Sequence, residues 1–332
     1  MKLPDNITPP YVRPKVEVRL DANESPFNSA CNRYAGADAL QRLKTAWGQH
    51  EHIPAACSYF CNGTEEATDL IMRVYALPNR DSVVAAVPTR SLYKRRALIN
   101  RLEYREAPLR NTDYELQAEA VLDAVSETTQ LIFLCSPNSP TGNLLDAAEI
   151  EKLLDLFDGM VVVDEAYIDF APQASVLGLL NKYKNLIVLR SFSHGWSMAG
   201  VHVATVVAHP EVINEMVRVG FSHPLSAVQI AALTHIVEHR LDVDKWVRQI
   251  TDERRKVQMA LSNLPECQRI YHSDANFLLV RFADNDSVYD YLLQCGIAVY
   301  KAAGCLRITI GLPNENSALL GALRKRQGSV RL

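Results

Sequence analysis

The segment "MVVVDEAY", residues 160–167, decides the fold class of this chain. An unbroken apolar run that ends in an aspartate is typical of a strand buried on both faces, with a polar group at its carboxyl end. Similar runs lie on either side of it: "SVVAAVP" (82–88), "QLIFLCSP" (130–137), "NLIVLRS" (185–191) and "ATVVAHP" (204–210). Runs of this kind indicate a parallel sheet that helices cover on both faces.

Helical patterns separate these runs. In "TEEATDLIMRVYAL" (64–77) we expect Thr64 to be the N-cap, because two acidic residues follow it and the apolar residues repeat on one helix face. In "DAAEIEKLLDLFDG" (146–159), Asp146 and Glu149 have the spacing of a capping box. The alternation of strands and helices predicts an α/β fold with a mainly parallel, mixed sheet.

The pattern changes after about residue 220. A long helical region, roughly 224–264, leads into "ANFLLVRF" (275–282), a helix over 286–296, and the short segments "GIAVY" (296–300) and "CLRITIG" (305–311). We therefore predict a large α/β domain over 31–235 and a smaller α+β domain over 236–332. Residues 1–30, with four prolines in the first half, are expected to form an extended N-terminal arm.

The composition narrows the class of protein. The chain has 332 residues, of which 48% are hydrophobic and 22% charged, and a net charge of −3, so it shows no basic surface for nucleic acid. No apolar run of about 18 residues and no signal core occur, so we expect a cytoplasmic protein without membrane contact. Its seven cysteines form no CxxC pair, which favours neither disulfides nor a zinc site.

Polar residues follow several of the predicted strands, where ligands bind in open α/β sheets. "CNGTEE" (61–66) enters a helix through Gly63, Thr64 and Glu65, which suits either an anion site or an ordinary capped helix. "SPNSPTGN" (136–143) is a rigid turn that would aim Asn138. The remaining candidates at these strand ends are Asp164, Tyr167, Ser191 and Ser193.

These stretches resemble the fold-type I pyridoxal-phosphate aminotransferases, and within them the histidinol-phosphate aminotransferases. The resemblance rests on segments that run in order along nearly the whole chain: "LDANESPF", "NRYAG", "CNGTEEATDLI", "SPNSPTGN", "VVVDEAYIDF", "LIVLRSFSHGWSMAG", "SDANFLLVRF" and "CLRITIG". It implies that fold, with a large domain and a smaller C-terminal domain.

The resemblance also implies roles for individual residues. Asp164 matches the carboxylate that pairs with the pyridine nitrogen, and Asn138 and Tyr167 match groups on the phenolic oxygen. The phosphate ligands match Gly63, Thr64, Glu65, Ser191 and Ser193. Tyr34 matches a tyrosine that reaches the phosphate of a neighbouring subunit, which implies a homodimer, and Arg307 and Asn23 match substrate-binding positions.

The chain departs from the family at four positions of chemical importance. His194 stands where the family has its Schiff-base lysine, and His202 replaces the arginine of "AGxRxG". Arg90 replaces the aromatic residue that stacks on the pyridine ring, and Tyr300 replaces an arginine before the last strand. An imidazole forms no stable imine, although it can act as a general base.

Three functions are compatible with this pattern. The first, which we favour at this point, is an enzyme that holds pyridoxal or pyridoxamine phosphate non-covalently, with His194 as base and a small anionic, amino-acid-like or amino-phosphate substrate. The second is a catalytically inactive partner subunit. The third is a site rebuilt for another anionic metabolite without the cofactor, in which Asp164 pairs with Arg90 or His202 instead.

Two further readings have less support in the sequence. Lys301 or Lys94 could replace the missing lysine, but the rest of the site fixes the reach of the cofactor aldehyde. His194 and His202 are eight residues apart and could in principle share a metal ion. No carboxylate or cysteine has the spacing that a metal site with them would need, so we expect no metal.

Overall fold

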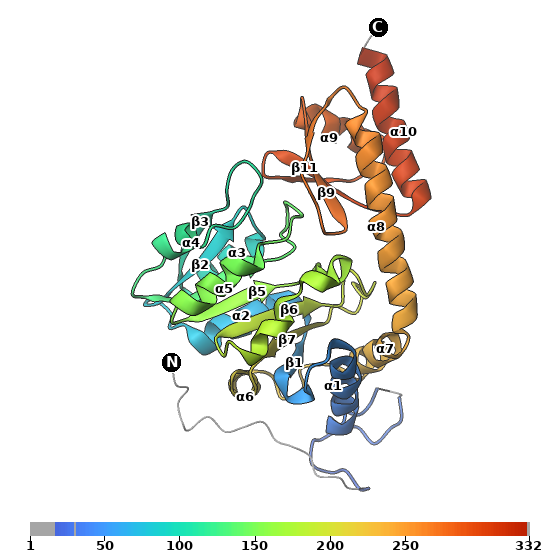
Figure 1. Cartoon of the computed structure of the whole chain (residues 1–332). Helices are drawn as coiled ribbons and strands as arrows, with labels where there is room; N and C mark the ends of the chain where they lie inside the picture. Colours follow the sequence, from blue (N-terminus) through green and yellow to red (C-terminus); the bar gives the residue numbers. More distant parts are fainter. Residues whose placement is uncertain (1–16, 30, 331–332) are drawn as a thin grey trace.

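The computed structural model of the chain describes residues 17–29 and 31–330 (Figure 1). A seven-stranded sheet has the order β1-β7-β6-β5-β4-β2-β3. Its strands are β1 (Ser58–Cys61), β2 (Ser82–Val87), β3 (Glu103–Pro108), β4 (Thr129–Cys135), β5 (Met160–Asp164), β6 (Leu186–Ser191) and β7 (Ala204–Ala208). Adjacent strands are parallel from β3 through β2, β4 and β5 to β6. Strand β7 is antiparallel to both of its neighbours, β6 and β1. The predicted α/β class with a mainly parallel sheet is confirmed.

Helices cover both faces of this sheet, because alternate strand residues point to opposite sides. One face packs against α1 (Ala37–Glu51), α4 (Ala118–Asp123), α5 (Ala147–Leu156) and α7 (Ala227–Glu238). The other packs against α2 (Gly63–Tyr75), α3 (Ser91–Ile99) and α6 (Pro210–Val219). In β2, for example, Val84 belongs to the first core, whereas Val83 and Ala85 belong to the second, and all three are fully buried.

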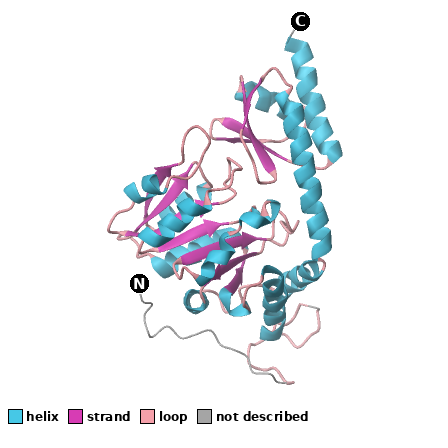
Figure 2. Ribbon diagram, in the orientation of Figure 1, coloured by secondary structure: helices cyan, strands magenta, loops and turns pink. Residues whose placement is uncertain are grey.

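A second, four-stranded antiparallel sheet lies toward the C-terminus, with the order β10-β11-β9-β8 (Figure 2). It comprises β8 (Cys267–Ile270), β9 (Phe277–Phe282), β10 (Tyr300–Ala302) and β11 (Cys305–Thr309), and packs with α9 (Asn285–Gln294) and α10 (Pro313–Val330). Short 3-10 helices are η1 (Ala55–Cys57), η2 (Ile168–Phe170), η3 (Pro172–Ala174) and η4 (Val176–Asn181).

Helix α8 (Arg240–Ser262) connects the two parts (Figure 1). Its 23 residues span roughly 35 Å at about 1.5 Å per residue. Val243, near its start, belongs to the core of the large sheet, whereas Val257 and Leu261 belong to the core of the small sheet. The first part of α8 therefore packs against the large sheet, and its last part packs against the small sheet. The division between 235 and 236 stays a prediction, and so does the arm, of which only residues 17–29 are described.

Local details correct two of the helix predictions. Thr64 is not the N-cap of α2: the helix begins at Gly63, whose φ of +76° turns the chain, and Asn62 precedes it. At the start of α5, the Asp146 side chain accepts a hydrogen bond from the Ala148 N–H, but the Glu149 carboxylate bonds to Ala118 instead of completing a capping box. At α5, a contact from elsewhere in the chain therefore replaces the local pairing.

No helix within 17–29 and 31–330 combines the length and the apolar character that crossing a membrane requires.

Candidate functional site

An ion pair between Arg90 and Asp164 lies at the carboxyl end of the parallel strands. Asp164 ends β5 and is fully buried, and Arg90 directly precedes α3, so the two strand ends bring them together. Arg90 NH1 is 2.5 Å from Asp164 Oδ2, and the Tyr93 hydroxyl donates to the same oxygen at 2.8 Å. The other carboxylate oxygen accepts from the Ala166 N–H at 3.1 Å. Every polar atom of the buried carboxylate is thus satisfied within the chain.

The second guanidinium nitrogen of Arg90 extends this contact to a third element. Arg90 NH2 donates to Thr64 Oγ1 at 3.0 Å, which links the first turn of α2 to the end of β5. Burial alone would lower the pKa of Arg90, but the Asp164 carboxylate raises it well above its ordinary value. Arg90 is therefore a permanent cation whose side chain is 20% exposed.

The side chain of Asn138 forms hydrogen bonds with neighbouring loops. Its side-chain amide donates to the Pro88 carbonyl and to Thr141 Oγ1, both at 2.8 Å. Its carbonyl oxygen accepts from Thr89 Oγ1 at 2.9 Å. Because the residue is 1% exposed, these bonds fix it as a tie between the loops that follow β2 and β4.

His194 stacks on Tyr167, with ring centroids 4.5 Å apart and an angle of 20° between the planes. Burial, and next the charge of Arg90, lower the pKa of His194 to about 4. Its imidazole is therefore uncharged at neutral pH. The edge of Phe277 packs on Tyr167 from the small sheet, at 5.2 Å, so the stack lies where the two parts of the chain meet.

At the start of α2, where the resemblance implies phosphate ligands, the His202 ring packs on Gly63. A Cβ added to Gly63 would lie 2.4 Å from the His202 ring, so the imidazole rests directly on this glycine. At the neighbouring strand end, Ser191 Oγ accepts a hydrogen bond from the Ser193 N–H at 3.2 Å. Glu65 points away toward Arg96, with an ion pair of 2.7 Å.

A cavity of about 900 Å³ lies between α3 and the β10–β11 hairpin, and His194, Asp164 and Asn138 are not among its lining residues. Arg90, Tyr167, Tyr300 and Arg307 line it. Arg307 NH1 donates to Ser139 Oγ at 2.9 Å, and its guanidinium lies over the rings of Tyr300 and Phe277 at 4.9 and 5.2 Å. Arg307 Nε is buried without a hydrogen-bond partner. The cavity therefore contains two guanidinium groups around an aromatic wall.

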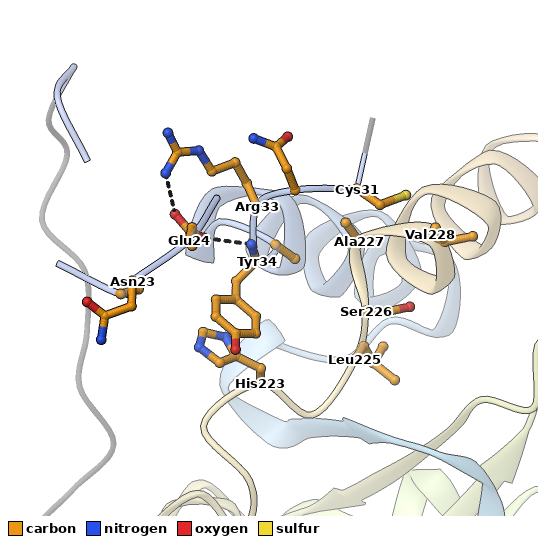
Figure 3. Close-up of a pocket in the computed structure, with 13 residues that line it drawn as sticks. Asn23, Glu24, Cys31, Arg33, Tyr34, His223, Leu225, Ser226, Ala227 and Val228 are labelled. Carbon is orange, nitrogen blue, oxygen red and sulfur yellow. Dashed lines mark hydrogen bonds and ion pairs between the residues drawn. The ribbon is translucent and has the colours of Figure 1, made fainter. Parts of the chain in front are cut away.

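Asn23 and Tyr34 lie elsewhere. They line a separate pocket of about 480 Å³, where Tyr34 stacks on His223 at 4.1 Å (Figure 3). The Tyr34 N–H donates to a Glu24 carboxylate oxygen at 2.7 Å, which fixes the segment. Tyr34 itself is 51% exposed.

The structure also shows contacts that sequence reasoning missed. The Tyr93 hydroxyl donates to Asp164 from the first turn of α3, three residues after Arg90, which caps this helix; that close spacing was the available signal. Behind the His194 loop, Arg190 forms buried ion pairs with Glu51 at 3.1 Å and Glu165 at 3.2 Å. A single arginine inside the apolar run 185–191 was the signal for that cluster, since a buried charge requires partners.

The remaining lysine and metal alternatives gain nothing from the geometry. Lys94 pairs with Glu106 at 3.0 Å and Lys301 with Asp286 at 2.6 Å, both on the exposed rim. Across the part of the chain that the structure describes, no group of three or more metal-ligating side chains is placed to hold a metal ion.

This fold and site define a class. The family model of aminotransferase class I and II matches residues 15–323, and the chain belongs to that family. Among its relatives are histidinol-phosphate aminotransferases. That of Parabacteroides distasonis is 39% identical over 314 residues, which cover 92% of this chain and 90% of the relative. That of Cytophaga hutchinsonii is 37% identical over 316 residues, with the same two shares.

Solved structures show the same fold. The histidinol-phosphate aminotransferase from Sinorhizobium meliloti in complex with pyridoxal-5'-phosphate has a TM-score of 0.82 at 20% identity, covering 93% of this chain and 90% of that one. The enzyme from Clostridium acetobutylicum has a TM-score of 0.82 at 18% identity, with coverage of 90% and 92%. Members of this family use pyridoxal phosphate.

The side chains of this protein, as they lie, do not fit that cofactor. A pyridine nitrogen would have to displace the Arg90 guanidinium from Asp164, and a protonated pyridine would be repelled by it. The Asn138 amide already donates to two other groups, and the His202 ring packs on Gly63, which matches a phosphate ligand of the family. The partners of Asp164 and Asn138 thus occupy two of the groups that the resemblance assigns to the cofactor ring.

Proposed function

We propose that this member of the aminotransferase family binds a small anionic metabolite in the 900 Å³ cavity, without a pyridoxal cofactor. The observation that carries the proposal is the buried ion pair of Arg90 with Asp164, which supplies from within the chain the cation that a pyridinium ring supplies in the family. The charge of the buried Asp164 carboxylate is thereby balanced by Arg90, so the proposed site does not need a cofactor cation for that purpose.

The proposed ligand is recognised by its charge. Arg307 lines the cavity, and its guanidinium lies over the rings of Tyr300 and Phe277, which hold its plane. A planar guanidinium suits carboxylate and phosphate alike. Arg90 adds a second positive charge at the wall that Tyr167 shares. A small amino-acid-like or amino-phosphate anion, such as phosphoserine, fits this arrangement.

The second candidate function keeps the cofactor and is supported by one observation. His194 is uncharged at neutral pH, as a general base must be, and it stacks on Tyr167 beside Asp164. Pyridoxal or pyridoxamine phosphate would then be held non-covalently, with His194 as the base. This candidate requires Arg90 to leave Asp164, which costs the buried ion pair, so we rank it second.

A calorimetric titration separates the two candidates. We expect the natural protein to bind phosphoserine or glutamate, and to bind neither pyridoxal phosphate nor pyridoxamine phosphate. Arg307→Met should abolish binding of the anions, because the clamp is lost, whereas Arg110→Met, at an exposed arginine outside the cavity, should not. Micromolar binding of either cofactor form, about −8 kcal/mol, would overturn the proposal in favour of the second candidate.

A restored variant provides the matching control. Arg90→Tyr, His194→Lys and His202→Arg together restore the residues that the family has at three of the positions where this chain departs from it. We expect this variant to turn yellow with pyridoxal phosphate as an imine forms on the new lysine. Cofactor binding by the variant alone would show that these three residues, and not the rest of the fold, exclude the cofactor.

A further inference from the structure

Behind one wall of the 900 Å³ anion cavity, two segments of the chain touch at two points that are in register. The segment that follows β5 contains Tyr167 and, two residues later, Asp169 in η2. The loop 192–203, which joins β6 to β7, contains His194 and, two residues later, Trp196. Tyr167 stacks on His194, and the Trp196 indole N–H donates to Asp169 Oδ1 at 3.1 Å. The loop is thus fixed to this segment twice.

Asp169 also contacts the backbone of the loop. A Cβ added to Gly195, which lies between His194 and Trp196, would come within 2.4 Å of Asp169 Cβ and 2.6 Å of its Oδ2. A residue with a side chain at 195 would therefore push the loop away from Asp169. Asp169 and Trp196 are both buried, at 3% and 2% exposed, so little water competes for their hydrogen bond.

Two arginines balance the charge of Asp169 from the side away from the loop backbone. Arg190 NH2 lies 3.6 Å from Asp169 Oδ1, and Arg240 NH1 lies 3.9 Å from the same oxygen. Burial raises the pKa of Asp169, and the two arginines oppose that effect. The Arg240 guanidinium also lies over the Trp196 ring, at 4.4 Å from its centroid. The hydrogen-bonded pair of Asp169 and Trp196 is therefore itself held in place.

The loop in turn supports Tyr167. The His194 ring lies against one face of the Tyr167 ring, and Phe277 packs on Tyr167 edge-on at 5.2 Å. Tyr167 lines the anion cavity, whereas His194, Asp169 and Trp196 do not. The orientation in which the Tyr167 ring meets a ligand thus depends on where the loop holds His194.

We infer that Asp169 is a positioning residue of the anion cavity, whose contacts with Trp196 and Gly195 hold His194 against the Tyr167 ring. The inference rests on the proposed function, because Tyr167 is the member of this group that a ligand would touch. It adds a role for a buried carboxylate outside the cavity. Without the bond to Trp196, the loop would no longer hold His194 in place, and the wall formed by Tyr167 would lose its support.

The test follows the His194 imidazole by nuclear magnetic resonance of the full chain, labelled at the histidine rings, with His194→Gln to identify the signal. Because the pKa of His194 is about 4 in the natural protein, its signal should stay constant between about pH 5 and 8. Trp196→Phe removes the indole donor and keeps an aromatic ring. We expect the pKa of His194 to rise toward its ordinary value of 6.5 in this variant as the imidazole gains contact with water, so its signal should move over that range. Phosphoserine binding should weaken several-fold.

Two variants of Asp169 separate its role as an acceptor from its role in packing. Asp169→Asn keeps an oxygen for the Trp196 indole and the two arginines, and Asp169→Leu does not. We expect the His194 signal to stay constant with pH in the asparagine variant and to move in the leucine variant, and phosphoserine binding to follow the same order. These variants keep the inference testable if Trp196→Phe folds poorly. Trp47→Phe, at a tryptophan that is 1% exposed, is the matched control: it should lower stability and leave the His194 signal constant.

The inference is overturned if Trp196→Phe and Asp169→Leu both leave the His194 signal constant with pH, or if Trp47→Phe moves it as far as they do. It is equally overturned if the signal moves while phosphoserine binds to these variants as tightly as to the natural protein. The resonance measurement needs no ligand. A natural protein that binds no phosphoserine therefore contradicts the proposed function alone, and the His194 signal still decides whether Asp169 positions the ring.

Discussion

At the scale of single residues, the choice of partner for Asp164 separates this chain from the chemistry of its family. The sequence predicted that the carboxylate would be buried, because it ends an apolar strand, and left its partner open among a pyridine nitrogen, Arg90 and His202. Arg90 and Asp164 are 74 positions apart. No local pattern reports that their side chains meet, since the meeting depends on which strands are neighbours and on which rotamer a long side chain adopts.

We expect Arg90→Met to destabilise the protein by about 3–5 kcal/mol, because it leaves a fully buried carboxylate without its cation. Adding Asp164→Asn to this variant should recover part of the loss, since the uncharged amide no longer requires the cation. Urea unfolding of the two single variants and the double variant measures the coupling. Arg110→Met, at an exposed ion pair, should leave the free energy of unfolding nearly unchanged. Additive losses from Arg90 and Asp164 would contradict the pairing.

At the scale of elements, the sequence predicted best those strands that consist of a continuous apolar run. The runs over 82–88, 130–137, 160–167, 185–191 and 204–210 correspond to β2, β4, β5, β6 and β7 within a few residues. Strands β1 and β3 were not predicted: β1 has only four residues, and β3, "EYREAP", is mostly polar because it forms an edge of the sheet. Position in the sheet, which sequence periodicity does not contain, decides such strands.

The start of α2 provides a test at this scale. Gly63→Ala should destabilise the protein, because alanine at a φ of +76° is strained and its Cβ would meet the His202 ring. Each such strained residue costs on the order of 1–3 kcal/mol. Gly178→Ala is the matched control, since nothing lies within 4 Å of an added Cβ there.

The steric part of this effect can be separated from the backbone part. Adding His202→Ala to Gly63→Ala should recover only the loss that comes from the ring, as thermal or urea unfolding of the three variants measures. If the double variant is no more stable than Gly63→Ala alone, the histidine does not close the start of the helix.

At the scale of the whole molecule, the predicted site residues that line a pocket fall into two groups. Arg90, Tyr167, Tyr300 and Arg307 meet at one cavity, whereas Asn23 and Tyr34 lie in the pocket of Figure 3. The family resemblance assigns Tyr34 to the site of a neighbouring subunit, which would explain why a single chain keeps the groups apart. The predicted homodimer is therefore the assembly in which both groups could serve one ligand.

Exposed apolar side chains support that assembly. Val18, Leu20 and Phe27 are 74%, 89% and 81% exposed in the single chain, and covering such residues is a main stabilising contribution in protein association. We expect sedimentation equilibrium to give a mass of about 74 kDa, twice the 37.1 kDa of one chain. Leu20→Ser with Phe27→Ser should shift the mass toward the monomer, because the apolar contact area is lost.

The same experiment connects assembly to the anion cavity. If Tyr34 reaches the cavity of a partner, Tyr34→Ala should weaken phosphoserine binding while the mass stays that of a dimer, because an exposed tyrosine contributes contacts to the ligand and few to the interface. Lys182→Ala, at an exposed lysine that lines neither pocket, is the control for a general surface effect and should change neither quantity. A natural protein that sediments as a monomer at about 50 µM, above the micromolar dissociation constants of many weak dimers, would refute the assembly and with it the shared site.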